Sequence, residues 1–591
     1  MAVLDVQQSL QRAEAELRAG RLDSAREELD HARRSEGESA DLLHLTALVE
    51  KGSGNIQAAL DAFSGALRLA PNNPQLMMNY ANLLQAIGEL EAALSLYDYA
   101  RKLDPRSANL RFNRVLVLIA LRRVPEALGE INELVAAQPF EPSFHTMRGV
   151  ILRALGRLSE ASDAFDRAIA LEPSRLLALH GRAQIAKERD EDGASDFYRR
   201  ALSSYPGNGE ILLGFAEALE AEGRADDAVE RLEEAVRKTP GWVDGQAALA
   251  RMRWELNKDE TFTRDLETAL VAEPGNGPLW SVLATTLAGA DLPAAAAQAA
   301  SEGVRATDGE PRLRLLEAFL VSEAGDLKRA DELFAALPGD IAGRQFSEAR
   351  HALRAHRFDE ASRLLDAARE ENPWDIAVWA ITGLAWRLTS DPRSEWLSFQ
   401  PGIVRALELD VDADELARIA ESLRTLHRTR TRPLHQSLRG GTQSRGRLFE
   451  RPEPEIRLFA ERIEAAVQRY WNELPDADAT HPLLRHRAAR PLIEGSWSVR
   501  LSGGGFHVAH FHPEGIVSSA GYVVVPPATQ QGEGWLEIGA APADLKLALD
   551  PIATVEPRPG RLALFPSYMF HGTRPFSKGE RLTAAFDVVA A

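Results

Sequence analysis

The sequence predicts a multidomain protein in which an all-α solenoid of repeated helix pairs precedes an α+β domain with a jelly-roll core. A chain of 591 residues is too long for a single hydrophobic core, so we expect two or more domains. Prolines recur with a spacing of 33 or 34 residues through much of the first half. After residue 494, short runs of β-branched and aromatic residues replace the helical pattern, which indicates a β-rich domain.

A pattern of glycine and proline marks the repeats of the helical part. Glycine stands at the end of the first helix, and proline follows the second helix of each pair. The prolines are Pro71, Pro105, Pro139, Pro173, Pro206, Pro240 and Pro274, and the glycines are Gly88, Gly156 and Gly223. Glycine permits a tight helix exit and proline stops a helix, so this spacing predicts stacked pairs of helices.

The 34-residue period and these residues resemble the tetratricopeptide (TPR) repeat. We count about seven clear units between Gly37 and Pro274, with degenerate units before and after them. Residues 1–390 are therefore predicted to form a TPR solenoid. The resemblance implies a concave face that binds a peptide or protein partner, and a pure scaffold or an oligomerisation surface is the alternative.

The composition is that of an ordinary globular protein, with 45% hydrophobic and 26% charged residues. The chain has no cysteine, which excludes disulfides and thiolate metal sites, so a metal would have to use His, Asp or Glu. No window approaches about eighteen uninterrupted apolar residues, and the N-terminal segment lacks a basic region followed by an apolar one. We expect no membrane partner and a cytoplasmic location.

The net charge of −18 is concentrated in the helical part. From Asp391 onward the chain has 25 acidic and 24 basic residues, a net charge of −1, which leaves −17 for residues 1–390. Nonspecific nucleic-acid binding needs a cationic surface, and neither part supplies one, so we expect no nucleic-acid partner. The acidic part suits a basic or neutral peptide, and it would also keep a large helical surface soluble.

Residues 391–494 are predicted to form a helical linker and support region, and residues 495–591 the jelly-roll core. The first region contains an amphipathic pattern at 412–427 and a second one in PEIRLFAERIEAAVQRYWNEL. The second region contains five strand-like runs separated by Gly, Pro and Asp. They are WSVRL, IVSSAGYVVVP, GWLEIG, RLALFP and LTAAFDVV.

Three histidines and an arginine lie within this strand-rich segment. His510, His512 and His571 form an H-x-H pair with one distant histidine, a pattern that can place three imidazole ligands on one face of a metal ion. The planar fork of Arg581 matches a carboxylate. Because strand side chains alternate between faces, Arg581 and Thr583 are expected on the same side.

The segments SWSVRLSGGGFHVAHFHPEGIVSSAGYVVVP, GRLALFPSYMFHGTRPF and ERLTAAFD resemble the double-stranded β-helix oxygenases that use Fe(II), 2-oxoglutarate and O2. More narrowly, they resemble bacterial members of this family that are often fused to TPR arrays. The resemblance covers roughly residues 400–591 and is sharpest over 495–588. It implies a dioxygenase that hydroxylates a peptide or protein substrate recruited by the TPR arm.

The resemblance also implies a role for each candidate residue. His510, His512 and His571 would hold the iron, Arg581 would pair with the far carboxylate of 2-oxoglutarate, and Thr583 would add a hydroxyl contact. Most of the superfamily has a carboxylate where this chain has His512, so a ligand set that includes Glu514 is the alternative. A noncatalytic TPR adaptor with a degenerate barrel is the rival function. A cupin-like metal enzyme is a third possibility, but it leaves Arg581 without a role.

Four further residues are not assigned as ligands of the metal or the cosubstrate. His507 is expected to be a surface or supporting group, and His427 and His435 are expected to be solvated. Arg500 is interpreted either as a second cation near the cosubstrate or as part of a structural ion pair.

Overall fold

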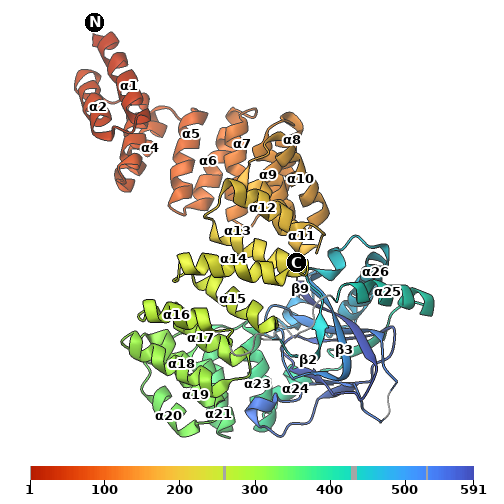
Figure 1. Ribbon diagram of the computed structural model, residues 1–591. Helices are drawn as coiled ribbons and strands as arrows, with labels where there is room; N and C mark the ends of the chain where they lie inside the picture. The colour runs from red at the N-terminus through yellow and green to blue at the C-terminus, as the bar shows by residue number, and fades with distance from the viewer. Residues whose placement is uncertain (1, 257–260, 428–435, 528–529, 591) are drawn as a thin grey trace. The chain divides into compact units, whose positions relative to one another are not determined.

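The computed structural model of this protein describes residues 2–256, 261–427, 436–527 and 530–590 (Figure 1). Contacts between residues divide the chain into two compact units, Met1–Arg182 and Ala183–Ala591. The first unit contains helical repeats, and the second contains further repeats together with the β-rich domain.

The first unit is built from consecutive helices, as the repeat pattern predicts. They are α1 (Ala2–Arg18), α2 (Leu22–Glu36), α3 (Ala40–Gly52), α4 (Ile56–Leu69), α5 (Pro74–Ala86), α6 (Leu90–Leu103), α7 (Ala108–Ala120), α8 (Val124–Ala137), α9 (Pro142–Ala154) and α10 (Leu158–Leu171), and α11 (Leu176–Glu188) crosses into the second unit. Pro71 and Pro105 each lie two residues beyond the end of a helix. Gly88 and Gly156 have φ values of 87° and 72°, a left-handed conformation that favours glycine, which confirms the predicted helix exits.

Helices of the first unit approach one another closely at glycine residues, which have no side chain. Phe165 on α10 is fully buried, and its ring lies against Gly149 of α9 and Gly181 of α11. A Cβ atom would lie 2.7 Å from the Phe165 ring at Gly149 and 2.4 Å from it at Gly181. Only glycine therefore lets one aromatic ring fill the space between the first helices of two successive repeats.

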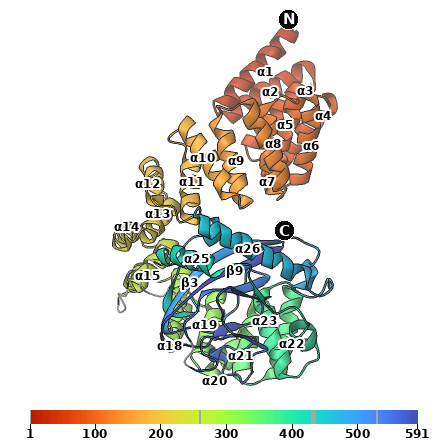
Figure 2. The ribbon, with the colours of Figure 1, turned by 90° about the vertical axis from the view of Figure 1, so that its right-hand side faces the viewer.

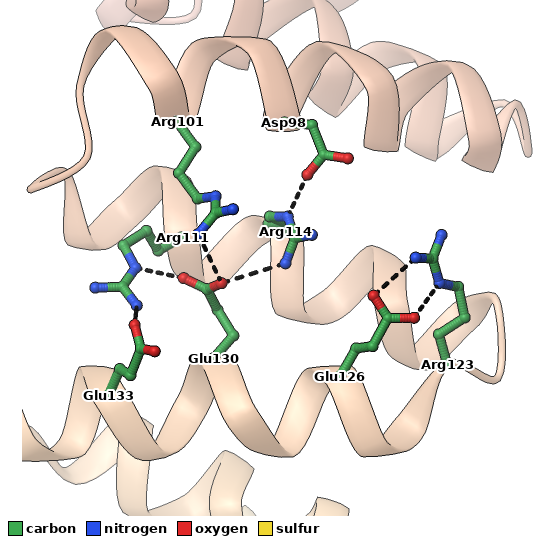
Figure 3. A network of polar contacts seen from close by, with 8 residues as sticks. All are labelled: Asp98, Arg101, Arg111, Arg114, Arg123, Glu126, Glu130 and Glu133. Carbon is green, nitrogen blue, oxygen red and sulfur yellow. Dashed lines mark hydrogen bonds and ion pairs between the residues drawn. The ribbon is translucent and has the colours of Figure 1, made fainter.

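A buried polar network joins α6, α7 and α8 (Figure 3). Glu130 on α8 is buried, and three arginines from the two preceding helices surround its carboxylate. Arg111 and Arg114 donate hydrogen bonds to Glu130, and Arg101 forms an ion pair with it at 3.7 Å. Arg114 also donates to Asp98 at 2.7 Å. These cations offset the cost of burying the Glu130 carboxylate.

The second unit continues the repeats through thirteen more helices of the described chain. They are α12 (Ala194–Ser204), α13 (Gly209–Ala221), α14 (Ala225–Lys238), α15 (Val243–Glu255), α16 (Arg264–Ala272), α17 (Gly277–Gly289), α18 (Pro293–Ala306), α19 (Pro311–Glu323), α20 (Leu327–Ala335), α21 (Arg344–Arg354), α22 (Phe358–Glu371), α23 (Ile376–Leu388) and α24 (Arg393–Ser398). Two helices then lie within the β-rich part, α25 (Ala413–Thr425) and α26 (Pro454–Asn472). Both correspond to the amphipathic segments predicted from the sequence.

Two antiparallel sheets form the β-rich domain. The strands are β1 (Arg405–Glu408), β2 (Leu438–Gln443), β3 (Pro491–His507), β4 (Val517–Val524), β5 (Leu536–Ile538), β6 (Ala553–Val555), β7 (Arg561–Pro566), β8 (His571–Thr573) and β9 (Glu580–Ala590). The larger sheet has the order β1-β7-β4-β9-β3-β2, and the smaller has the order β6-β5-β8. This arrangement confirms the predicted fold class of helical repeats followed by an α+β domain consistent with a double-stranded β-helix.

Two strands extend the larger sheet beyond the predicted core. β1 pairs with β7, and β2 pairs with β3, so residues predicted as a helical support region supply both edges of this sheet. β3 begins at Pro491, four residues before the predicted change at residue 495. The domain boundaries at residues 390 and 494 stay predictions. The division between the two compact units falls elsewhere, after Arg182.

One hydrophobic core joins the last repeats to the β-rich domain. It runs from Ala349 on α21 to Val588 on β9 and includes Trp386 of α23 and Phe459 of α26. Helix α26 lies along the larger sheet (Figure 2). No helix in the described part of the chain combines the length and apolar character of a membrane-spanning segment.

Candidate metal centre

The fold brings the three predicted histidines together. His510 and His512 follow strand β3, and His571 is the first residue of β8. His510 and His571 form an isolated antiparallel bridge, with backbone hydrogen bonds of 3.0 and 2.7 Å. One nitrogen from each of the three rings lies within 4.8 Å of the other two. The loop after β3 and the short strand β8 therefore form a single histidine cluster.

Each ring of the cluster is oriented by an oxygen acceptor at Nδ1. His510 Nδ1 donates to the Val508 carbonyl at 2.9 Å, and His571 Nδ1 donates to the Met569 carbonyl at 3.1 Å. His512 Nδ1 donates instead to a carboxylate. This tautomer leaves the lone pair on Nε2, which is the form of the ring that ligates a metal. The Nε2 atoms of His510 and His512 are 3.3 Å apart, close to the spacing of about 3 Å expected for two nitrogens on one ion.

Burial favours the neutral form of two of the three histidines, His510 and His571. Burial, with a contribution from nearby His512, lowers the pKa of His510 to about 4. Burial also holds the pKa of His571 well below its usual value, and the neighbouring His510 adds to the effect. Neutral imidazoles do not repel a cation and are the usual ligands of transition metals, so the cluster is chemically suited to one.

Arg581 is buried near the histidine cluster. Its side chain is 2% exposed, and burial lowers its pKa. The guanidinium donates to the Gly534 carbonyl and to Thr573 Oγ1, both at 3.0 Å, while its Nε atom is buried without a partner. No carboxylate among the described residues pairs with Arg581. The hydroxyl of Tyr522 is also buried without a partner.

A cavity of about 620 Å³ contains both the histidine cluster and Arg581. Arg581 and Thr583 line it together, which confirms that they share one face of β9. The hydroxyl of Thr583 donates to the Val499 carbonyl at 3.4 Å. Glu514 also lines the cavity, but it is exposed, and the metal-binding group found among the described residues comprises the three histidines.

Asp587 is a residue of the site that sequence reasoning missed. It lies on β9, and its Oδ1 accepts the hydrogen bond from His512 Nδ1 at 2.6 Å. The signal was present in the sequence, because alternation from Arg581 and Thr583 leads through Ala585 to Asp587, and all four line the cavity. Asp587 lies 75 residues from His512, so no local pattern indicated that the two interact.

His507 is a supporting group of the cavity rather than a surface residue. Its Nδ1 lies 3.0 Å from Ser437 Oγ, and its ring stacks on His510 with centroids 5.9 Å apart. Burial and the neighbouring His510 hold the pKa of His507 well below its usual value. Its backbone N–H donates to the same Thr573 hydroxyl that Arg581 contacts. His507 therefore helps to orient the side chains beside the cluster.

The remaining predictions have mixed outcomes. His427 is not solvated: its nitrogens contact Thr442 Oγ1 at 2.9 Å and Ser498 Oγ at 3.1 Å. Burial lowers the pKa of His427 to about 4. Arg500 forms an ion pair with Glu580 at 2.6 Å, which supports its structural interpretation. His435 lies outside the described residues.

The part of the chain that contains this site matches a known family. A family model described as "Putative 2OG-Fe(II) oxygenase" matches residues 495–587. Two models described as "Tetratricopeptide repeat" match the helical part, one at residues 10–74, 79–142 and 146–209, the other at 52–98 and 186–252. No protein of curated function matches the sequence significantly.

Solved structures that are similar to part of this chain include three bacterial proteins. A tetratricopeptide repeat protein from Parabacteroides merdae is 19% identical over 39% of this chain and 91% of its own, with a TM-score of 0.33. PilF of Pseudomonas aeruginosa is 20% identical over 37% of this chain and 99% of its own, with a TM-score of 0.33. TTC0263 of Thermus thermophilus is 22% identical over 30% of this chain and 98% of its own, with a TM-score of 0.26.

The repeat matches and the oxygenase match fall on separate parts of one chain, and the histidine cluster lies within the oxygenase match. The chain carries N-terminal tetratricopeptide repeats and a C-terminal domain of the family described as "Putative 2OG-Fe(II) oxygenase".

Proposed function

We propose that this protein is an Fe(II)- and 2-oxoglutarate-dependent dioxygenase that hydroxylates a peptide or protein substrate. One observation carries the proposal: a single cavity contains three converging imidazoles and a buried guanidinium with no carboxylate partner among the described residues. When bound, Fe(II) and 2-oxoglutarate supply the oxidation, in which one atom of O2 converts substrate C–H to C–OH and the other enters succinate as CO2 leaves.

The donor set fits iron. His510, His512 and His571 would hold the ion on one side through neutral nitrogen donors, and imidazole is an established ligand of iron. The backbone carbonyls and the carboxylate at the Nδ1 atoms fix the ring orientations before a metal arrives. The protein's contribution is therefore a preorganised face that leaves the opposite side open for the cosubstrate.

The buried cation fits a dicarboxylate. Arg581 donates only to neutral oxygen atoms, and a buried guanidinium without a counter-charge is costly. A carboxylate of 2-oxoglutarate would offset this cost by pairing with Arg581, and it would accept from the unpartnered hydroxyl of Tyr522. Thr583 lies beside Arg581 on the same strand face and would complete the polar end of the cavity. A metal enzyme without an anionic cosubstrate would leave Arg581 uncompensated.

A polypeptide substrate is favoured by the position of the repeats within the second unit. Ala288, Gly289 and Asp291, at the turn between α17 and α18, line the same cavity as the histidines. Asp291 forms an ion pair with Arg439 of β2 at 3.2 Å, which joins this turn to the larger sheet. TPR repeats are protein-interaction modules, so a substrate chain held by them would lie close to the histidine cluster.

Product formation tests this proposal. We would incubate the Fe(II)-loaded protein with 2-oxoglutarate, O2 and a pool of basic and neutral peptides, and measure succinate by NMR and peptide masses by mass spectrometry. We expect succinate together with a peptide that has gained one oxygen atom, and neither product with His571→Ala. Arg558→Ala, which removes an exposed arginine paired with Glu556, is the matched control and should keep the activity. Iron and 2-oxoglutarate bound without succinate from any peptide would contradict the proposal.

A further inference from the structure

We propose that Asp587 is a positioning residue of the metal centre, whose carboxylate anchors His512 and places a negative charge beside the three histidines. This inference rests on the proposed function, since it concerns the ion that His510, His512 and His571 would hold. It assigns a role to a carboxylate that does not itself belong to the three-histidine group.

His512 differs from the other two histidines in the kind of acceptor that it uses. His510 and His571 donate to backbone carbonyls at 2.9 and 3.1 Å, whereas His512 donates to the Asp587 carboxylate at 2.6 Å. A hydrogen bond to a charged acceptor is shorter and stronger than one to a neutral acceptor. The bond from His512 is the shortest of the three. It also increases the basicity of the ring and so strengthens the bond from Nε2 to a cation.

Asp587 is itself held in place by buried hydroxyl groups. Ser518 Oγ donates to Asp587 Oδ1 at 3.2 Å and lies 2.9 Å from Ser567 Oγ. Both serines are fully buried. A Cβ atom at Gly515 would lie 2.9 Å from Ser567 Oγ and 3.0 Å from Asp587 Cβ, so glycine leaves room for this arrangement. The carboxylate therefore has a fixed orientation toward His512.

The charge of Asp587 has no competing partner nearby. No lysine or arginine among the described residues forms an ion pair with it, and its carboxylate instead accepts from the imidazole of His512. An ion with two positive charges on three neutral ligands would keep its full charge. A carboxylate one imidazole away would stabilise that charge by Coulomb attraction in the poorly solvated cavity.

Metal titration of substituted proteins tests this role without any turnover. Asp587→Asn keeps an oxygen that can accept from His512 and removes the charge, and Asp587→Ala removes both. We would measure the Kd for Co(II), a spectroscopic stand-in for Fe(II), in the full chain and record the melting temperature without metal. Asp587→Asn should weaken binding by about 10- to 100-fold with little change in metal-free melting, and Asp587→Ala should weaken it at least as much.

The matched control is Glu556→Gln, which neutralises a half-exposed carboxylate of the same domain away from the cavity and should leave the Kd unchanged. If Asp587→Asn does not fold, Ser518→Ala decides, because it removes the hydroxyl that supports Asp587 and should weaken binding in the same direction. An unchanged Kd in the folded variant would overturn the role of Asp587 while leaving the oxygenase proposal intact. A wild-type protein that binds no metal would overturn the oxygenase proposal itself.

Discussion

The Arg451 guanidinium donates a 2.7 Å hydrogen bond to the carboxylate of Asp190, and both side chains are largely buried. Arg451 precedes helix α26 of the β-rich domain, and Asp190 follows α11 among the repeats of the same compact unit. The neighbouring Arg447 N–H donates to the Glu188 carbonyl at 2.7 Å, so side chain and backbone both fix this junction. The repeats of the second unit and the β-rich domain are therefore joined by buried polar contacts as well as by a shared core.

Removing this contact should destabilise the second unit. Arg451→Ala removes a charged hydrogen bond from the largely buried carboxylate of Asp190, a change that costs about 1.5–3 kcal/mol. We expect a lower midpoint of urea unfolding for the transition that reports on the β-rich domain. Arg558→Ala removes an exposed pair and should shift the midpoint little. Equal midpoints for the two variants would show that the junction adds no stability.

The β-rich domain should not fold without the last repeats. The shared core includes Leu365 of α22 and Trp386 of α23, so residues 391–591 alone would expose apolar surface that these helices cover. A fragment of residues 340–591 retains α21 to α23 and should melt cooperatively, whereas residues 391–591 should not. Near-ultraviolet circular dichroism during heating distinguishes them. Cooperative melting of the shorter fragment would contradict this dependence.

A pair of glycine substitutions tests the packing of the repeats. Gly149→Ala places a Cβ atom 2.7 Å from the buried ring of Phe165 and should destabilise the first unit by about 1–3 kcal/mol. Gly129→Ala lies on helix α8 with open space around the new atom and should stabilise it by about 0.5–1 kcal/mol. Thermal unfolding of the two variants should therefore move in opposite directions. A Gly149→Ala protein as stable as wild type would refute the close approach.

Acid should destabilise the protein in part through His427. Its pKa falls to about 4 in the folded protein because the ring is buried, against about 6.5 when the chain is unfolded. The stability from a neutral His427 is therefore complete above pH 6.5 and is lost as the pH falls toward 4. His427→Gln should lose less unfolding free energy than wild type between pH 7 and 4, by up to about 3 kcal/mol. Parallel urea-unfolding profiles for the two proteins would contradict this assignment.

The two candidate sets of metal ligands differ in which substitution should abolish metal binding. His512→Ala should remove most Co(II) affinity, because its ring belongs to the converging cluster. Glu514→Gln should keep the affinity, because Glu514 is exposed at the cavity margin. Titration of both variants by visible absorption measures the difference. Loss of binding with Glu514→Gln would favour the ligand set that includes this carboxylate.

Features that repeat along the sequence or alternate within one strand were predictable. The prolines and glycines gave the helix pairs, because proline and glycine act on the backbone within a few residues. Alternation placed Arg581 and Thr583 on one face, and it could have placed Asp587 there as well.

Pairings between distant segments were not predictable in the same way. Strands β1 and β2 are short and carry little β-forming signal, and they form because β7 and β3 offer free edges. His427 contacts Ser498, and His507 contacts Ser437. Each serine lies about 70 residues from its histidine in the sequence. The sequence around His427 and His507 therefore gave no sign that the two side chains would be buried.

The most direct measurement is anaerobic absorption spectroscopy of the Fe(II) protein as 2-oxoglutarate is added. The account predicts a metal-to-ligand charge-transfer band in the wild-type protein and in Arg558→Ala. It predicts no band in Arg581→Ala at the same 2-oxoglutarate concentration, although iron stays bound to the three histidines. A wild-type protein that holds iron but shows no band at saturating 2-oxoglutarate would contradict the central claim.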